Sequence, residues 1–436
     1  MILPLLEKLL IIKQKGNMQR GAILLSSVEL INEILNRNNL KTEFIIKNFF
    51  RKNKFAGSKD KKQIKDLIFG FFKSYFTLKK AFKDKYLKFS YRNGLLFYYF
   101  NINAQLKLDN IYEGKYSIKP APEDKKIFME AISLKSEVVP TLPSWLEVKL
   151  NDDLKKEKAK IYESILAKPR LDIRVNNHLI KREKVLNILE KNNILSKKTS
   201  FSPLGITVLK RTRKNILEKL KNNFFEIQDE GSQLVTILSS VEKDMKVLDY
   251  CAGKGTKTLA LYDQMLGKGE LYVYDISNER LNILRKRIDT LNIKKKIMFF
   301  HDTKKLINYF DLILLDVPCS GSGVWRRRPE DLIKLDKYKL KNNIVIQKKL
   351  LDRASTYCKK NGIISYITCS IFKDENENQI ESFVSKNKGF KILDINLNLK
   401  KKLQNMDLQS KKKWLTLTPS YCNSDGFFIC LLKKYV

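Results

Sequence analysis

From residue 246 onward, short apolar runs alternate with stretches of helical periodicity, and this alternation limits the folds open to the chain. Runs that read as strands begin at Val247, Leu271, Ile297, Asp311 and Ile363. Strands that alternate with helices favour an α/β fold with a doubly wound, mainly parallel sheet, which binds ligands at the carboxyl ends of its strands. The residues at or just past those ends are Asp249, Asp275, Asp302, Asp316 and Cys369. We therefore expect one composite site at this edge.

A turn with two glycines follows the first of these strands. Residues 249–258 read Asp-Tyr-Cys-Ala-Gly-Lys-Gly-Thr-Lys-Thr. Glycines let a backbone approach a ligand closely, and the following helix offers free N–H groups, although many such turns are only structural. The turn lacks the Gly-Lys-Ser/Thr ending of a phosphate-binding P-loop. Asp275, at the end of the next strand, is placed to accept hydrogen bonds from ribose hydroxyls. NAD and S-adenosylmethionine both fit this pattern.

Two cysteines distinguish between these cofactors. Cys319 lies in Asp-Val-Pro-Cys-Ser-Gly-Ser-Gly (316–323), and Cys369 lies in Tyr-Ile-Thr-Cys-Ser (366–370). A hydride-transfer enzyme needs no paired thiols, whereas methylation of a pyrimidine at C5 does. That carbon becomes nucleophilic only after a thiolate adds to C6, and a base must afterwards remove the C5 proton. We read the remaining cysteines as packing residues, namely Cys251, Cys358, Cys422 and Cys430.

The composition indicates a polyanionic partner. The chain has 436 residues, with 85 basic and 47 acidic side chains and a formal net charge of +38. This excess favours nucleic acid, because neutralising phosphates releases counterions; a genome rich in A and T also raises the lysine content. With two histidines and no Cys-x-x-Cys pair we expect no metal site, and six cysteines in a chain of this length favour reduced thiols and the cytoplasm. Residues 1–12 are apolar but too short to span a membrane, so no membrane partner is expected.

The chain divides into three predicted parts. Residues 15–135 read as an all-helical domain, in which the apolar residues between 64 and 76 share one helix face and Ser58 is placed to cap that helix. Residues 136–225 combine a proline-bearing linker with mixed strand and helix patterns, which predicts a small α+β module. Residues 226–436 hold the α/β domain.

These residues resemble the RNA cytosine-C5 methyltransferases of the Nol/Nop/Sun group, in particular the bacterial RsmB (Sun/Fmu) type. The resemblance rests on Gln-Asp-Glu-Gly-Ser-Gln (228–233), Leu-Asp-Tyr-Cys-Ala-Gly (248–253), residues 316–323, Thr-Cys-Ser (368–370) with Glu-Asn-Glu (375–377), and Asp-Gly-Phe-Phe (425–428). It implies a Rossmann-like, S-adenosylmethionine-dependent methyltransferase domain. Trp145 and residues 170–176 are similar to the family's small RNA-contacting module, and residues 55–60 with the N-terminal helices resemble its NusB-like RNA-binding domain.

The resemblance also implies a role for each site residue. Cys369 would be the nucleophile that adds to C6 of the cytosine, and Cys319 would assist product release near the elimination of the C5 proton. Asp316 would hydrogen-bond the target base, and Lys257 would reach its ring. The implied cofactor is S-adenosylmethionine, with contacts from Cys251, Ala252, Gly253, Lys254, Gly255, Thr256, Lys257, Asp275, Asp302 and Asp316.

The chain departs from the family's usual sequence in the glycine-containing turn. Lys254 and Gly255-Thr256 stand where the family usually has proline and a Gly-Gly pair. Threonine adopts fewer backbone conformations than glycine, so we expect any change in cofactor affinity to originate here.

We therefore expect a cytoplasmic, monomeric enzyme that methylates a cytosine of 16S rRNA. Its target would be an unstacked base in a loop or remodelled RNA, and Arg326, Arg327 and Arg328, which follow the Cys319 turn, would contact that RNA. Two alternatives stay open. One is a tRNA cytosine-C5 methyltransferase of the same fold, and the other is a non-catalytic RNA-binding factor of ribosome assembly.

Overall fold

The computed structural model describes the chain apart from residues 1–17, 38–39, 135–140, 155–157, 210–216, 218, 221–222, 294–295, 301–305, 404–409 and 411. Asp302 and the apolar segment 1–12 thus lie outside the described residues. The chain forms two compact units, which are described separately. The helical unit contains residues 1–167 and 325–335, and the sheet unit contains residues 168–324 and 336–436.

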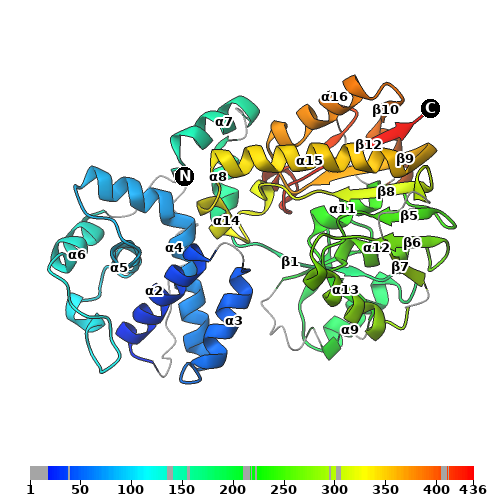
Figure 1. Ribbon diagram of the computed structural model, residues 1–436. Coiled ribbons are helices and arrows are strands. Elements are labelled where there is room, and N and C mark those ends of the chain that lie inside the picture. Colours follow the sequence, from blue (N-terminus) through cyan, green and yellow to red (C-terminus); the bar gives the residue numbers. More distant parts are fainter. Residues whose placement is uncertain are drawn as a thin grey trace. The chain divides into compact units, whose positions relative to one another are not determined.

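The helical unit is built almost entirely from the first third of the chain (Figure 1). Its helices are α2 (Arg20–Asn36), α3 (Thr42–Lys52), α4 (Ser58–Asp84), α5 (Tyr91–Ile102), η1 (Leu108–Ile111), α6 (Asp124–Ser133), α7 (Ser144–Leu154) and α8 (Lys158–Leu166), joined by α14 (Pro329–Ile333). The apolar stripe expected on α4 lies in the core, where Ile64, Ile68 and Phe71 are fully buried. Ser58 does not cap α4: the cap position is Gly57, whose N–H donates to the Asp60 carboxylate at 2.9 Å. The likeness to NusB stays a prediction.

A small antiparallel sheet opens the sheet unit. Its strands, in the order β2-β3-β1-β4, are β1 (Leu171–Val175), β2 (Ser196–Lys198), β3 (Gly205–Val208) and β4 (Phe225–Ile227). Helix α9 (Arg182–Lys191) buries Val185 and Leu189 in one apolar cluster with Ile173 and Ile206 of the strands. The RNA-contacting role expected of this region stays a prediction.

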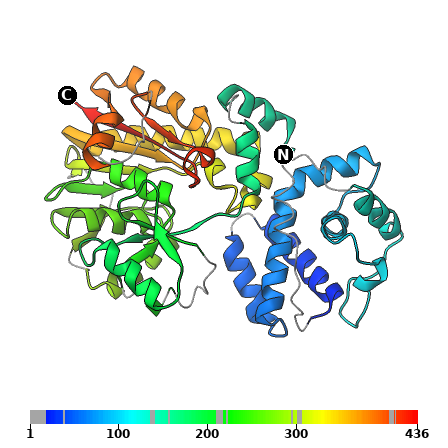
Figure 2. The same cartoon turned by 180° about the vertical axis from the view of Figure 1, so that it is seen from behind.

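The large sheet of the same unit has the predicted doubly wound α/β architecture. Its strands are β5 (Lys246–Asp249), β6 (Glu270–Val273), β7 (Ile297–Phe299), β8 (Phe310–Asp316), β9 (Cys358–Thr368), β10 (Phe390–Leu393), β11 (Leu415–Leu417) and β12 (Phe427–Lys434). The order is β10-β12-β9-β8-β5-β6-β7, with β11 paired to β12. The run from β9 to β7 is parallel, and β10, β11 and β12 pair antiparallel. Figure 2 shows these C-terminal strands, coloured orange to red, together at one side of the sheet.

Helices cover both faces of the large sheet. They are α11 (Glu230–Leu238), α12 (Thr256–Gln264), α13 (Asn278–Thr290), α15 (Lys337–Tyr357), α16 (Glu377–Lys386) and α17 (Ile395–Lys402), with the short η4 (Ser322–Val324), η5 (Lys373–Glu375) and α18 (Pro419–Cys422) in the loops. Side chains alternate along each strand. Val247 and Leu314 therefore join the core under α11, α12, α13 and α17, while Leu248 and Leu315 join the core under α15 and α16.

Two findings limit what the described residues contain. None of their helices is both long enough and apolar enough to cross a bilayer. The described parts of the chain also hold no cluster of three or more His, Cys, Asp or Glu side chains that could hold a metal ion.

Candidate active site

The two cysteines singled out by the sequence meet at the carboxyl edge of the large sheet. Cys319 follows β8 and Cys369 directly follows β9, and these strands are parallel neighbours with Asp316 in register with Ile367. The two Sγ atoms lie 3.3 Å apart, and both side chains are half-buried. The N–H of Gly323 also donates to the carbonyl of Cys369 at 2.9 Å, which links the two turns through the backbone. The structure therefore brings together two thiols that are far apart in the sequence.

The environment of Cys319 keeps its proton in place. The hydrogen bond to Cys369 raises the pKa of the Cys319 thiol well above its ordinary value, and burial and the charges of Cys369 and Glu375 raise it further. Either sulfur of the pair can be the donor by geometry, and the raised pKa of Cys319 is consistent with a proton on that sulfur. A proton-bearing thiol is a poor nucleophile, so this arrangement favours Cys369 for attack.

A lysine and an aspartate face the thiols from the same edge. Lys257 Nζ, on α12, lies 2.7 Å from Asp316 Oδ2 at the end of β8. Burial lowers the pKa of Lys257, but the charge and hydrogen bond of Asp316 and the nearby Cys369 together raise it above its ordinary value. An ammonium group is thus held beside both Asp316 and Cys369. Asp316 keeps 29% of its side chain exposed, so its carboxylate stays open to a ligand.

The glycine turn (residues 251–255) joins β5 to α12 at the same edge. Gly253 and Gly255 have φ values of +58° and +82°, which other residues rarely adopt. Gly253 N–H donates to Asp275 Oδ2 at 2.8 Å, so the acid that follows β6 also shapes the turn. Asp275 lies only 5% exposed and pairs with Arg280 at 3.1 Å.

The departures from the family's usual sequence have little structural consequence for the backbone of this turn. Thr256 is the first residue of α12 and is not among the described residues with positive φ, so the expected restriction from threonine is wrong. The left-handed position falls on Gly255, which the chain retains. Lys254 is exposed, and its carbonyl accepts a hydrogen bond from Arg287 on α13 at 2.5 Å. Arg287 also pairs with Glu226 at 2.8 Å.

A buried carboxylate lies next to the glycine turn. Asp249, the last residue of β5, is 1% exposed and accepts a hydrogen bond from Thr258 Oγ1 at 2.6 Å. In the described part of the chain its Oδ1 has no hydrogen-bond partner. Burial raises the pKa of Asp249 to about 7. Ala252 and Cys251 complete the turn, and burial raises the pKa of the Cys251 thiol well above its ordinary value, which makes it an unreactive packing residue.

The arginine run after the Cys319 turn is not a uniformly exposed surface. Arg326 is 4% exposed and Trp325 is 1% exposed, and both belong to the helical unit. The expectation of an RNA contact is therefore wrong for Arg326. Its charge acts on Lys73 of α4 instead: burial and the charge of Arg326 lower the pKa of that lysine to about 8. Arg328 is exposed and pairs with Asp331 at 2.9 Å.

The chain matches two family models. Residues 235–433 match the model described as 16S rRNA methyltransferase RsmB/F, and residues 142–215 match the ferredoxin-like domain of RsmF/B-like methyltransferases. The structure is similar to the crystal structure of PH0851, with a TM-score of 0.74 and 20% identity over 96% of this chain and 100% of that one. It is also similar to NSun6 from Pyrococcus horikoshii, with a TM-score of 0.58 and 20% identity over 68% of this chain and 99% of that one. At these identities the two likenesses concern the fold alone.

One relative is more similar in sequence to this chain than the two solved structures are. The chain is 32% identical over 290 residues to the probable ribosomal RNA small subunit methyltransferase B of Coxiella burnetii. That match spans 63% of this chain and 64% of the relative, which is less than two thirds of the relative's length. The two family models, which match residues 142–215 and 235–433, and this relative agree in pointing to the RsmB/F methyltransferases as the family that the chain resembles.

Proposed function

We propose that the chain is an S-adenosylmethionine-dependent methyltransferase that methylates C5 of a cytosine in small-subunit rRNA, through a covalent bond between Cys369 and C6. The observation that carries this proposal is the 3.3 Å thiol pair, at the same sheet edge as the glycine turn. The names of the curated relatives support rRNA as the substrate, and the net charge of +38 suits a polyanion. NSun6 was solved with SFG, an S-adenosylmethionine analogue, which supports the cofactor.

The residues around the glycine turn fit this cofactor. A Cβ built at Gly253 would meet no atom closer than 4.0 Å, so that side of the turn is open to a ligand. The N-terminus of α12 begins there, and the unpaired Oδ1 of Asp249 lies at the end of the adjoining strand. Ile276, which follows Asp275, is 85% exposed and offers an apolar surface for a flat ring. When bound, S-adenosylmethionine supplies an electrophilic methyl group.

Cys369 would begin the reaction on the base. Its thiolate adds to C6, so that a C–S bond forms and the electron pair of the C5–C6 double bond moves onto C5. C5 then takes up the methyl group. The C5 proton then passes to solvent water acting as the base, the electron pair of that C–H bond restores the double bond, and the bond between C6 and Cys369 Sγ breaks, so that Cys369 leaves as a thiolate. Cys319 lies 3.3 Å from the departing sulfur and is positioned to act in this release step.

Lys257 and Asp316 would prepare these steps. The Lys257 ammonium stabilises negative charge on Cys369 before attack, because opposite charges at short range in a buried site attract strongly. It also fixes the Asp316 carboxylate at 2.7 Å, which leaves the other carboxylate oxygen to accept a hydrogen bond from the amino group of cytosine.

Methyl transfer from labelled S-adenosylmethionine to small-subunit RNA tests this proposal. We expect Cys369→Ala to lower the rate by about 10³-fold or more and to form no covalent protein–RNA complex, because the nucleophile is lost. We expect Cys319→Ala to accumulate that complex. Cys422→Ala is the control, since this cysteine is buried in the core.

Three outcomes would contradict parts of the proposal. Exchanged phenotypes of the two cysteine variants would show that the assigned roles are wrong. Label found only in tRNA would favour the tRNA methyltransferase instead. A wild-type protein that does not bind S-adenosylmethionine in a titration would favour the non-catalytic assembly factor.

A further inference from the structure

A fully buried glutamate lies behind the two thiol-bearing turns. Glu375 ends η5, a few residues after Cys369, and its side chain is 0% exposed. Its Oε1 accepts hydrogen bonds from the backbone N–H of Ser320 at 2.8 Å and from Gln347 Nε2 at 3.1 Å, and its Oε2 accepts one from Ser320 Oγ at 2.5 Å. All three of these hydrogen bonds are donated to the carboxylate oxygens. Ser320 directly follows Cys319, so the Glu375 carboxylate holds the Cys319 turn through both the backbone and the side chain of Ser320.

The same group of residues reaches the Cys369 turn. Ser370, which follows Cys369, has its Oγ 3.2 Å from Ser320 Oγ and 3.0 Å from Ser322 Oγ. Ser322 Oγ in turn accepts a hydrogen bond from the N–H of Ile371 at 2.9 Å. We call Ser320, Ser322, Ser370, Gln347 and Glu375 the serine–glutamate network. It connects the residue after one thiol with the residue after the other, and all five of its members are at most 6% exposed.

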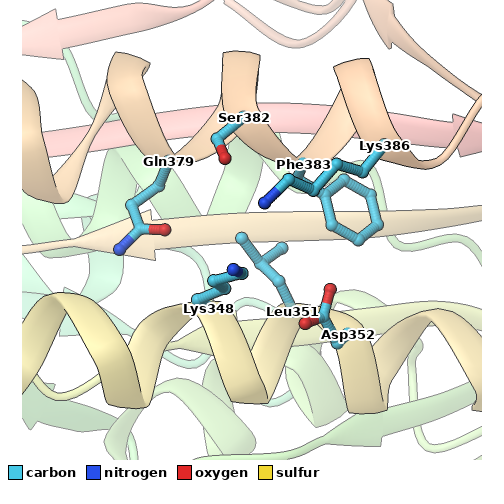
Figure 3. Close-up of a pocket in the computed structure, with 7 residues that line it drawn as sticks. All are labelled: Lys348, Leu351, Asp352, Gln379, Ser382, Phe383 and Lys386. Carbon is cyan, nitrogen blue, oxygen red and sulfur yellow. The ribbon is translucent and has the colours of Figure 1, made fainter.

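Two helices hold the network from behind. Gln347 on α15 donates to the carbonyl of Pro318 at 2.9 Å as well as to Glu375. Gln379 on α16 donates to Gln347 Oε1 at 3.3 Å, which orients that amide. Figure 3 shows Gln379 on α16 facing α15, beside a cavity of about 10 Å³. A cavity of that size holds at most about one water molecule.

We propose that Glu375 is a positioning residue that holds the Cys319 turn against the Cys369 turn and so sets the separation of the two thiols. The inference rests on the proposed function, in which one thiol attacks and the other acts at release. The carboxylate has a second effect: its charge adds to the hydrogen bond with Cys369 and to burial, which together raise the pKa of the Cys319 thiol. A purely structural glutamate would instead affect stability alone.

The first test measures how fast the two thiols form a disulfide, which depends on their separation, in the absence of RNA and cofactor. Glutathione disulfide oxidises the Cys319–Cys369 pair to one disulfide and is itself reduced to two glutathione thiols, and peptide mapping quantifies the product. In Glu375→Gln an NH2 group replaces one carboxylate oxygen, so the hydrogen bond that Ser320 Oγ donates to Oε2 is lost or reversed and the negative charge is removed. We expect disulfide formation to slow by about tenfold, because small displacements weaken reactions between oriented groups strongly.

Two further variants keep this test decisive. Glu381→Gln changes an exposed glutamate on α16 and should oxidise at the wild-type rate. Ser320→Ala removes the side-chain bonds of Ser320 to Glu375 Oε2, Ser322 and Ser370 but keeps the backbone bond to Glu375 Oε1. It should also slow oxidation, which covers the case in which Glu375→Gln does not fold. A folded Glu375→Gln or Ser320→Ala protein that oxidises as fast as wild type would overturn the inference.

The second test follows the reaction itself. With RNA and labelled S-adenosylmethionine we expect Glu375→Gln to accumulate the covalent protein–RNA complex, because Cys369 still adds while release through Cys319 is impaired. An equal loss of complex and product, accompanied by a lower melting temperature, would overturn a positioning role. If the wild type transfers no methyl group to any RNA, the proposed function fails, while the oxidation rates still decide whether Glu375 sets the thiol separation.

Discussion

The thiol turns and the glycine turn lie at the same edge of one sheet, but they are held by different means. The thiol turns rest on buried side chains: the carboxylate of Glu375 accepts three hydrogen bonds. The glycine turn depends on backbone geometry, with positive φ at Gly253 and Gly255 and single hydrogen bonds to Asp275 and from Arg287. In the proposed reaction two sulfur atoms act at a short separation, whereas a bound cofactor would need a backbone without side chains in its way. The two kinds of support suit these different needs.

The largest effect should come from adding a single methyl group to the glycine turn. In Gly255→Ala the new Cβ would lie 2.2 Å from Leu284 Cδ1, at a φ of +82°, so strain and overpacking should together lower the free energy of unfolding by about 3 kcal/mol. Gly253→Ala is the matched variant, because its Cβ meets open space and only the φ of +58° is strained. We expect Gly253→Ala to lower the free energy of unfolding by only about 1 kcal/mol. Urea denaturation of both variants checks the difference, and equal losses would show that Leu284 moves aside freely.

The buried carboxylate beside the glycine turn should make the stability of the protein depend on pH. Glu375 accepts three hydrogen bonds, whereas Asp249 accepts one, and burial raises the pKa of Asp249 to about 7 from an ordinary value near 4. The folded state therefore keeps a proton that the unfolded state loses between these pH values. The stability linked to that proton is complete below about pH 4 and is lost as the pH rises through about 7.

This linkage predicts a difference between wild type and Asp249→Asn. From pH 5 to pH 8 the wild type should lose about 2 kcal/mol of unfolding free energy relative to Asp249→Asn, which cannot ionise at this position. Urea denaturation at several pH values in this range gives the free energy of unfolding of each protein. The control is Asp289→Asn, at an exposed position of α13, whose curve of stability against pH should be parallel to that of the wild type. Parallel curves for Asp249→Asn and wild type would mean that Asp249 has an ordinary pKa in the folded protein.

The smallest effect should come from the side chain that supports the glycine turn. Arg287→Ala removes the hydrogen bond to the Lys254 carbonyl at 2.5 Å. We expect S-adenosylmethionine to bind about fivefold more weakly, which corresponds to about 1 kcal/mol, because the turn loses one restraint. Calorimetric titration measures this change. Lys286→Ala, at the exposed neighbouring position, is the control, and an unchanged affinity in Arg287→Ala would show that glycine geometry alone holds the turn.

The sequence predicted the location of the site better than the way it is held together. Parallel strands end at one edge, so the apolar runs were sufficient to place Asp249, Asp316 and Cys369 together. The alternation of strands and helices also predicted the doubly wound sheet correctly. The 3.3 Å contact of the thiols depends on β8 and β9 being neighbours, which the spacing of the runs does not reveal.

Contacts between distant segments explain what the sequence did not show. The string that contains Glu375 was noticed, but its role depends on Ser320 and Gln347, which no local pattern links to it. The hydrogen bond from Arg287 to the glycine turn also joins residues that are far apart in the sequence, so no local pattern revealed it. Arg326 was expected to contact RNA, yet it is buried in a unit composed mainly of residues from the start of the chain.

The membership of residues 325–335 in the helical unit has a practical consequence. Ile333 packs against the helical core, Lys334 Nζ donates to the carbonyl of Arg37 at 3.2 Å, and Trp325 and Leu332 are almost fully buried. A fragment cut after Ala167 would carry this segment away from the residues that bury it. Its apolar side chains would then face water just beyond the Cys319 turn. No single cut of the chain can therefore yield both units intact, and the protein should be produced and dissected as a whole.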